Sequence, residues 1–299
     1  MPKGMGVVDP VHIEIALGNF DVTSKLWASL IRQEPNVHDV TDDGRPRVRF
    51  ASTGVTSLDL VQASGSVRAG DCRLTMKAPD VAARVAALQA IGVPVSVDKK
   101  TGDARIAAKD ANGIDVILTE TRPPEIPGPP LAGLPYVYDF AVNDLTTSVP
   151  VWAAILGVDG VVTPEDADAS GTLEMHHYVT DGDTHAIGLM KCKADKKDSP
   201  DSMGGQVDYI LDTHGEGLLC VGFLYKTDLD EHIAALEEDV RSLLLFPEPR
   251  SYMMGRNNVT HARDTGGVQV IVAQHFEGWE GDLDAAVEGT WRPPESAGS

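Results

Sequence analysis

Hydrophobic positions along the chain change their period in a regular order, from the alternation of a strand to the spacing of a helix. Residues 12–17 alternate apolar and polar side chains, as a half-buried strand does. Apolar side chains then recur at i,i+4 spacing between residues 21 and 31, which predicts a helix packed on a sheet. Two further strand-like runs, 48–51 and 57–61, are separated by a turn at Gly54. The pattern therefore predicts a unit made of a strand, a helix and further strands.

The same order recurs along the rest of the chain. A second unit is predicted from a strand at 72–76, a helix at 80–91 and strands at 93–97, 104–107 and 114–119. In the second half, strands are predicted at 136–142, 173–179, 185–190, 219–225 and 268–273. Together these runs predict four βαβββ units and an α+β fold.

Segments of the first half return in the second half. The three repeated pairs are 26–31 with 151–156, 80–88 with 228–236, and 110–120 with 264–274. In both halves the opening strand lies fifteen residues before a tryptophan, from His12 to Trp27 (27 − 12) and from Val137 to Trp152 (152 − 137). Repeats of such long period are whole supersecondary motifs, so the second half is interpreted as a duplicate of the first. Trp27 and Trp152, at helical spacing, are predicted to be core anchors.

A proline-rich segment separates the two halves. Proline lacks the N–H and fixes φ, so residues 121–135 cannot continue a strand ladder or a helix and are predicted to be a stiff linker. The domains are accordingly predicted at 1–120 and 136–275, followed by an acidic tail at 276–299 that is partly disordered. The polar segment 191–217 is expected to be a connecting loop, or a loop that closes over a binding site.

Composition excludes several classes of function. The net charge of −20 opposes binding to nucleic acid and to anionic membranes, which need clustered Lys and Arg. The three cysteines have no CxxC spacing, so a disulfide framework or structural zinc site is not expected. The first ten residues lack an apolar leader, and no stretch of about eighteen apolar residues occurs. We expect a soluble cytoplasmic protein whose partner is a small-molecule substrate or ligand, with a homodimer as the candidate assembly.

Three features carry a resemblance to a known group of proteins. They are the strand exit Ala-Val-Asn-Asp-Leu at 141–145, the helix end Ile-Leu-Gly-Val at 155–158, and the Asp-x-x-Gly turns at Asp110 and Asp264. With four units joined in pairs, the chain resembles the vicinal oxygen chelate superfamily, and most of all its two-domain extradiol dioxygenases. The resemblance implies two half-open barrel domains, each formed by two paired units, and a divalent metal in a barrel mouth that is chelated by two neighbouring substrate oxygens.

The resemblance places the metal ligands at defined strand positions. In the carboxyl domain, the family's His, His and Glu correspond to Val137, Val221 and Ile271, and none of these side chains can bind a metal. An iron centre at that place is therefore not expected, despite the architecture.

In the amino domain, the corresponding residues are His12, Asp59, Arg73 and Ile117. His12 and Asp59 are candidate ligands for Fe, Mn, Ni or Zn. Alternatively, they form a metal-free acid–base pair beside Arg73, which would bind an anionic substrate. A third interpretation is purely structural: His12 is a satisfied strand histidine, and Arg73 pairs internally with Asp59 or Glu14.

The carboxyl half contains a second group of candidates. His176 and Tyr178 share one face of a strand, and His177 points to the other. The resemblance places His261 where a tyrosine usually faces the pocket. His261 and His176 are candidate catalytic residues, and the candidate substrate-binding residues are Arg73, Tyr178, Tyr252, Arg256 and Asn257. The alternative is that these histidines are surface and packing residues.

Three functions remain open. The first is an enzyme acting on a small oxygenated anionic compound, with aromatic compounds among the candidates, by proton transfer, isomerisation, elimination or ring cleavage. The second is a metal-free protein that binds and sequesters a small molecule, as bleomycin-resistance proteins do. The third is a structural or dimerising module. Polar residues at pocket-facing positions favour the first two, because an unused pocket would be expected to fill with aliphatic side chains.

Overall fold

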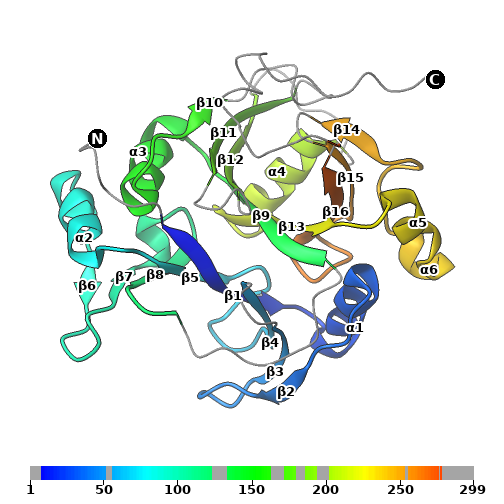
Figure 1. The fold of residues 1–299 in the computed structure, drawn as a ribbon, viewed down its shortest axis with the longest axis horizontal. Helices are drawn as coiled ribbons and strands as arrows, with labels where there is room; N and C mark the ends of the chain where they lie inside the picture. The colour runs from blue at the N-terminus through cyan, green and yellow to red at the C-terminus, as the bar shows by residue number, and fades with distance from the viewer. Residues whose placement is uncertain are drawn as a thin grey trace.

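The computed structural model describes residues 8–51, 56–122, 133–162, 172–179, 186–193, 202–252, 255–275 and 277. Within these residues the chain forms two eight-stranded mixed sheets flanked by short helices (Figure 1). The predicted tail and most of the predicted linker lie outside the described residues.

The first sheet is built by two βαβββ units in succession. The first unit comprises β1 (Asp9–Leu17), α1 (Phe20–Ile31), β2 (Val37–Val40), β3 (Pro46–Phe50) and β4 (Ser57–Gln62). The second comprises β5 (Cys72–Lys77), α2 (Val81–Ala90), β6 (Ser96–Val97), β7 (Ala104–Ile106), the 3-10 turn η1 (Ala108–Asp110) and β8 (Ile114–Thr119).

The second sheet repeats this order with two additional helices. The third unit comprises β9 (Gly133–Ala141), α3 (Leu145–Leu156), β10 (Val161–Val162), β11 (Leu173–Val179) and β12 (Ala186–Cys192). The first additional helix, α4 (Met203–Thr213), lies between the third and fourth units, and the second lies within the fourth unit. The fourth unit comprises β13 (Gly217–Tyr225), α5 (Leu229–Ala234), α6 (Glu238–Arg241), β14 (Arg250–Tyr252), β15 (Gly255–Val259) and β16 (Gln269–His275). The predicted fold of four βαβββ units in two half-barrels is confirmed.

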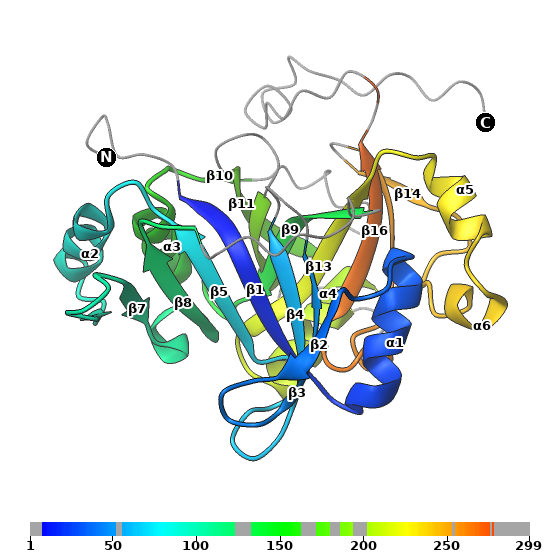
Figure 2. The same ribbon diagram turned by 60° about the horizontal axis from the view of Figure 1, so that its bottom comes forward.

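Each sheet is assembled in the same way. The strand orders are β2-β3-β4-β1-β5-β8-β7-β6 and β10-β11-β12-β9-β13-β16-β15-β14. The opening strands of two successive units pair antiparallel at the centre, β1 with β5 and β9 with β13. Each opening strand also pairs in parallel with the last strand of its own unit, as β1 does with β4. This arrangement makes each sheet a curled half-barrel with one convex and one concave face (Figure 2).

The repeated helices start with the same capping chemistry. Asp80 is the N-cap of α2 and accepts a hydrogen bond from the backbone of Ala83, and Asp228 caps α5 through the backbone N–H groups of Asp230 and Glu231. A carboxylate at this position satisfies amide donors that the helix leaves unpaired. The sequence echo between 80–88 and 228–236 thus has a local physical cause.

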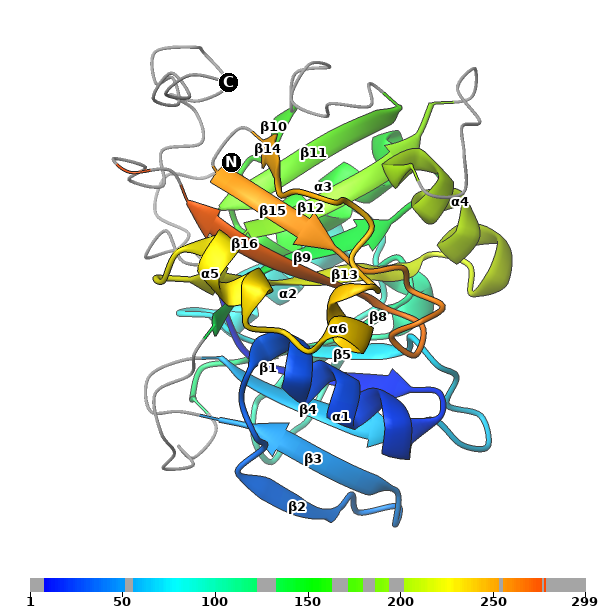
Figure 3. The same ribbon diagram turned by 90° about the vertical axis from the view of Figure 1, so that its right-hand side faces the viewer.

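The convex faces of the two sheets share one hydrophobic core. Alternate residues of β1 and β4 and of β9 and β13 meet there, together with residues of α1 and α3. Figure 3 shows the two sheets as adjacent layers. Trp27 and Trp152 are both fully buried, as predicted for core anchors. Each also joins the halves: the Trp27 indole N–H donates to the carbonyl oxygen of Thr265 at 3.0 Å, and that of Trp152 donates to Oδ1 of Asn112 at 3.1 Å. The concave faces are therefore the surfaces left for function. No helix in the described ranges is long and apolar enough to cross a membrane.

Candidate functional site

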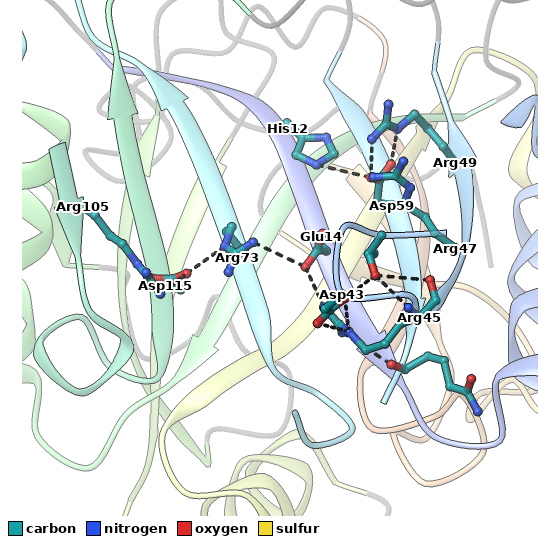
Figure 4. A network of polar contacts seen from close by, with 12 residues as sticks. His12, Glu14, Asp43, Arg45, Arg47, Arg49, Asp59, Arg73, Arg105 and Asp115 are labelled. Atoms are coloured by element: carbon teal, nitrogen blue, oxygen red, sulfur yellow. Dashed lines mark hydrogen bonds and ion pairs between the residues drawn. The ribbon is translucent and has the colours of Figure 1, made fainter. Parts of the chain in front are cut away.

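Charged side chains cover the concave face of the first sheet. Six neighbouring strands and the turn before β3 contribute to it (Figure 4). We call this set the charged face: His12, Glu14, Arg45, Arg47, Arg49, Asp59, Arg73, Arg105 and Asp115. These charged side chains share one face because side chains alternate along each strand, and the residues between them point into the shared core.

Asp59 is the buried centre of the charged face. Its side chain is fully buried, and both carboxylate oxygens accept hydrogen bonds from Nε and a terminal nitrogen of Arg49. A nitrogen of Arg47 lies 3.4 Å from Oδ2 of Asp59. The register of the β3–β4 pair places Arg49 directly opposite Asp59. A carboxylate this deeply buried is stable only when paired, so the two guanidinium groups fix its position.

His12 lies between Ser57 and Asp59. Its Nδ1 is 2.7 Å from the Ser57 hydroxyl, and its Nε2 is 3.6 Å from Oδ2 of Asp59. Burial lowers the pKa of His12; Asp59 raises it, and the nearby guanidinium groups, Arg49 first, lower it further. The imidazole is therefore neutral at pH 7 and able to accept a proton. Its side chain keeps 17% of its surface exposed.

Arg73 joins the two ends of the charged face. Its Nε donates to Asp115 at 2.8 Å, and another of its nitrogens lies 3.8 Å from Glu14. Arg105 binds the same Asp115 carboxylate through two nitrogens, at 2.6 and 3.0 Å. The internal partners of Arg73 are thus Glu14 and Asp115. Its side chain is still 42% exposed, so part of the guanidinium faces the open side of the sheet and can bind an anion.

A divalent metal does not fit this arrangement. The oxygens of Asp59 are held by Arg49 and Arg47, and His12 lies within the electrostatic reach of three guanidinium groups. A doubly charged cation there would face this positive charge and compete with Arg49 for its ligand. Ile117, which alternates with Asp115 on β8, has no donor atom. In the described part of the chain, no three His, Cys, Asp or Glu side chains are grouped to hold a metal ion.

The concave face of the second sheet is apolar. Val137 and Ile271 lie on it and are buried in a second hydrophobic cluster. The expectation that Val221 lies beside them is wrong, because β13 has a register irregularity between Leu218 and Cys220. This bulge turns Val221 into the shared core, as an extra strand residue reverses the alternation that follows it.

Helix α4 packs against this apolar face. Val207 and Ile210 are buried among residues of β9 and β13, and Gln206 accepts a hydrogen bond from Gln269 at 3.2 Å. The expectation of a plain loop over 191–217 is therefore wrong. Ser202 caps the helix by accepting from the backbone of Gly205. This cap, followed by apolar residues at i,i+3 spacing, was the sequence signal for the helix.

A buried polar cluster lies on the same face and was not predicted. The Asp139 carboxyl is 3.0 Å from the Cys220 thiol and 4.0 Å from Nε2 of His177. Burial raises the pKa of Asp139 to about 6 and lowers the pKa of His177 to about 4. Gly188 leaves the space between them, since a Cβ there would lie 2.2 Å from Asp139. The sequence signal was the alternation along β9, which puts Asp139 on the same face as Val137.

The structure does not bring the candidates of the carboxyl half together. His176 and Tyr178 face α3, where the Tyr178 hydroxyl donates to the carbonyl oxygen of Val149. His261 is buried beside the ring of Tyr209, and its Nδ1 accepts from the backbone of Arg263 at 3.2 Å.

The remaining carboxyl-half candidates lie on the outer strands. Arg256 binds Asp230 of α5 through two of its nitrogens. Asn257 is half-buried opposite Ala273, and the side chain of Tyr252 lies outside the described residues. Of the predicted candidates whose side chains are described, His12, Asp59 and Arg73 are the ones that lie together, on the charged face.

Comparisons with known proteins concern the fold. No family model and no curated protein matches the sequence. Solved structures match over both domains, among them a mutant of 4-hydroxymandelate synthase from Streptomyces coelicolor with a TM-score of 0.59 and 13% identity, covering 94% of this chain and 98% of that one. A 2,2',3-trihydroxybiphenyl 1,2-dioxygenase from Sphingomonas wittichii strain RW1 matches with a TM-score of 0.60 and 14% identity, covering 94% of each chain. A catechol 2,3-dioxygenase matches with 0.56 and 14%, covering 90% of this chain and 88% of that one.

Proposed function

We propose that this chain, which has the two-domain fold of the vicinal oxygen chelate superfamily, is an enzyme that acts on a small oxygenated anionic compound at its charged face. His12 is the proton acceptor, and the arginines bind the anion. The solved enzymes that share the fold are named for 4-hydroxymandelate, catechol and trihydroxybiphenyl, so small hydroxylated aromatic compounds are the first substrates to test.

One observation carries this proposal. The face that holds metal ligands in the family's pattern here holds a neutral imidazole next to a buried carboxylate, with a half-exposed arginine beside it. Such a set binds a carboxylate through charge-assisted hydrogen bonds and accepts a proton at neutral pH. On the second concave face, α4 and aliphatic side chains cover the surface, and the polar cluster of Asp139, Cys220 and His177 is buried beneath them.

The chemistry proposed for this face requires no divalent metal. In metal-dependent enzymes, a metal ion supplies the positive charge that polarises a substrate oxygen. Here guanidinium groups supply that positive charge. Asp59 lies beside His12, and its own position is fixed by Arg49 and Arg47. His12 then exchanges a proton with the reacting group. The reaction class is proton transfer, as in isomerisation, elimination or hydrolysis.

The test uses protein dialysed against a chelator and a panel of small hydroxylated aromatic carboxylates, their esters and their lactones. Consumption of each compound is followed by NMR. We expect turnover in the metal-depleted protein, and we expect His12→Ala to lower it about 10²–10⁴-fold, which is the usual contribution of a general base. Turnover that appears only after Fe, Mn, Ni or Zn is added back would refute the metal-independent assignment.

Substrate binding is tested separately with Arg73→Gln. Loss of a charge-assisted hydrogen bond is worth about 1.5–3 kcal/mol, so we expect affinity for a bound carboxylate to fall about 10–100-fold. The control is Arg68→Gln, an exposed arginine paired with Asp71 outside the charged face, which should leave affinity unchanged. Tight binding with no turnover of any compound would favour the sequestration function instead.

A further inference from the structure

Ser57 completes a line of three groups across the charged face. It stands opposite His12 in the parallel pairing of β1 with β4, and Asp59 follows it by two residues on the same face of β4. The Ser57 hydroxyl lies 2.7 Å from Nδ1 of His12, and Nε2 of the same ring lies 3.6 Å from Asp59. The order hydroxyl, imidazole, carboxylate is the arrangement that activates a serine nucleophile on unrelated folds.

The two ring nitrogens of His12 determine which group can react. One nitrogen faces Ser57 and the other faces Asp59, so in the tautomer that carries its hydrogen on Nε2 the free Nδ1 can accept the Ser57 proton. Ser57 is half-buried on the concave side, and the half-exposed Arg73 lies on the same face of the sheet, on the far side of β1. We infer that Ser57 is a catalytic nucleophile and that the substrate class is an ester or lactone bearing a carboxylate. The inference rests on the proposed function for anion binding, and it adds the reaction.

The reaction is an acyl transfer to water. The Ser57 oxygen attacks the ester carbonyl carbon, and the hydroxyl proton passes to Nδ1 of His12. The C–O bond to the leaving alcohol then breaks, and His12 returns the proton to that oxygen. A water molecule attacks the acyl-serine carbon and gives its proton to His12. The bond between carbon and the Ser57 oxygen breaks, and that oxygen regains the proton, releasing the carboxylic acid.

The surrounding arginines support each step. Arg49 and Arg47 fix the Asp59 carboxylate, which in turn orients the imidazole, so Asp59 is a positioning residue. The cluster of guanidinium groups favours the negative charge that develops on the carbonyl oxygen. Arg73 keeps an exposed edge for the carboxylate of the substrate. This combination selects an acyl compound that carries its own negative charge.

The first experiment treats the full-length protein with a fluorophosphonate, which reacts covalently with activated serines. Peptides are then mapped by mass spectrometry. We expect the label on Ser57 of the parent, and we expect Ser57→Ala to lose it. The matched control is Ser96→Ala, an exposed serine of β6 in the same domain whose hydroxyl bonds to a backbone carbonyl instead of an imidazole. This control should keep the label on Ser57.

The second experiment follows release of 4-nitrophenol from the 4-nitrophenyl monoester of succinate, with 4-nitrophenyl acetate as the uncharged comparison. We expect a burst equal to the protein concentration with the succinate ester. Ser57→Ala should lose at least about 1,000-fold in rate while keeping the thermal unfolding temperature and the affinity for succinate.

The outcomes separate the two proposals. A parent protein with no label on Ser57 and no burst overturns the nucleophile, even when succinate binds and His12→Ala abolishes turnover of other compounds. A label on Ser57 without any binding of anions supports the nucleophile and refutes the anion-binding function. An equal burst from Ser57→Ala also overturns the nucleophile, whatever its affinity for succinate.

Discussion

Replacing Asp139 by Asn should make the protein more stable at neutral pH and leave it unchanged in mild acid. The Asp139 side chain is 3% exposed, and its carboxyl contacts the Cys220 thiol and His177 on the apolar concave face. Burial raises its pKa from the ordinary 3.8 to about 6, against the lowering effect of the hydrogen bond with Cys220. Between pH 3.8 and about 6, the folded protein therefore keeps a proton on Asp139 that the unfolded chain has already lost.

The direction and size of the change in unfolding free energy follow from this pKa. One pH unit is worth about 1.4 kcal/mol, so a change from 3.8 to about 6 corresponds to about 3 kcal/mol. Because the pKa is raised on folding, the contribution of Asp139 to stability is complete below pH 4 and is lost as the pH rises through about 6. Asn cannot ionise and loses nothing over this range. Because the pKa of His177 is lowered to about 4, this histidine makes stability rise with pH, which is opposite to the effect of Asp139. Both the parent and the variant contain His177, so its effect is common to them.

The measurement is urea unfolding of parent and Asp139→Asn at several pH values between 4 and 8, followed by tryptophan fluorescence. We expect equal stability near pH 4 and a gain of about 3 kcal/mol for the variant at pH 7.5. Asp42→Asn, an exposed carboxylate, is the control and should change stability by less than about 0.5 kcal/mol throughout. A difference that does not vary with pH, or a variant less stable than the parent at pH 7.5, would refute the reasoning.

Two further predictions concern the joint between the halves. Gly113 has a φ of +81°, and a Cβ there would lie 1.9 Å from the carbonyl oxygen of Glu216. Gly113→Ala should therefore lower the unfolding free energy measured in urea by about 4 kcal/mol. The control is Gly92→Ala, which has a φ of +83° but open space around the Cβ and should cost only about 1 kcal/mol. Trp27→Phe leaves the buried carbonyl of Thr265 without its donor and should cost about 2 kcal/mol of stability. Trp152→Phe removes the donor to Asn112 and should cost a similar amount. If neither variant lowers the thermal midpoint, these hydrogen bonds do not hold the halves together.

The sequence was sufficient for the fold because the fold depends on periodicity. The shared core takes alternate residues of each central strand and one stripe of each helix, and this pattern is repeated in both halves. Features that depend on one extra residue were not predictable in the same way. The bulge before Cys220 changes the face on which Val221 lies, and no local composition marks it.

The candidate site was predicted in part, for a comparable reason. His12, Asp59 and Arg73 lie at the expected strand positions and on one face. Their partners Arg49 and Asp115 come from β3 and β8, and only the register between strands places them there. Pairings of this kind are set by tertiary structure, so the sequence left open whether Arg73 bonds to Asp59 or Glu14.

The duplication explains why the two concave faces differ so much. The convex faces pack on each other, so a substitution there disturbs both halves and is restricted to apolar residues of similar volume. The concave faces carry no such constraint. One became charged, with Asp59 buried among arginines, and the other became apolar and received α4, with Ile210 buried against it. A packed helix and a substrate cannot occupy the same face, so the charged face is the one left open to a substrate. Substitutions of His12 and Arg73 should therefore change activity, while substitutions under α4 should change stability first.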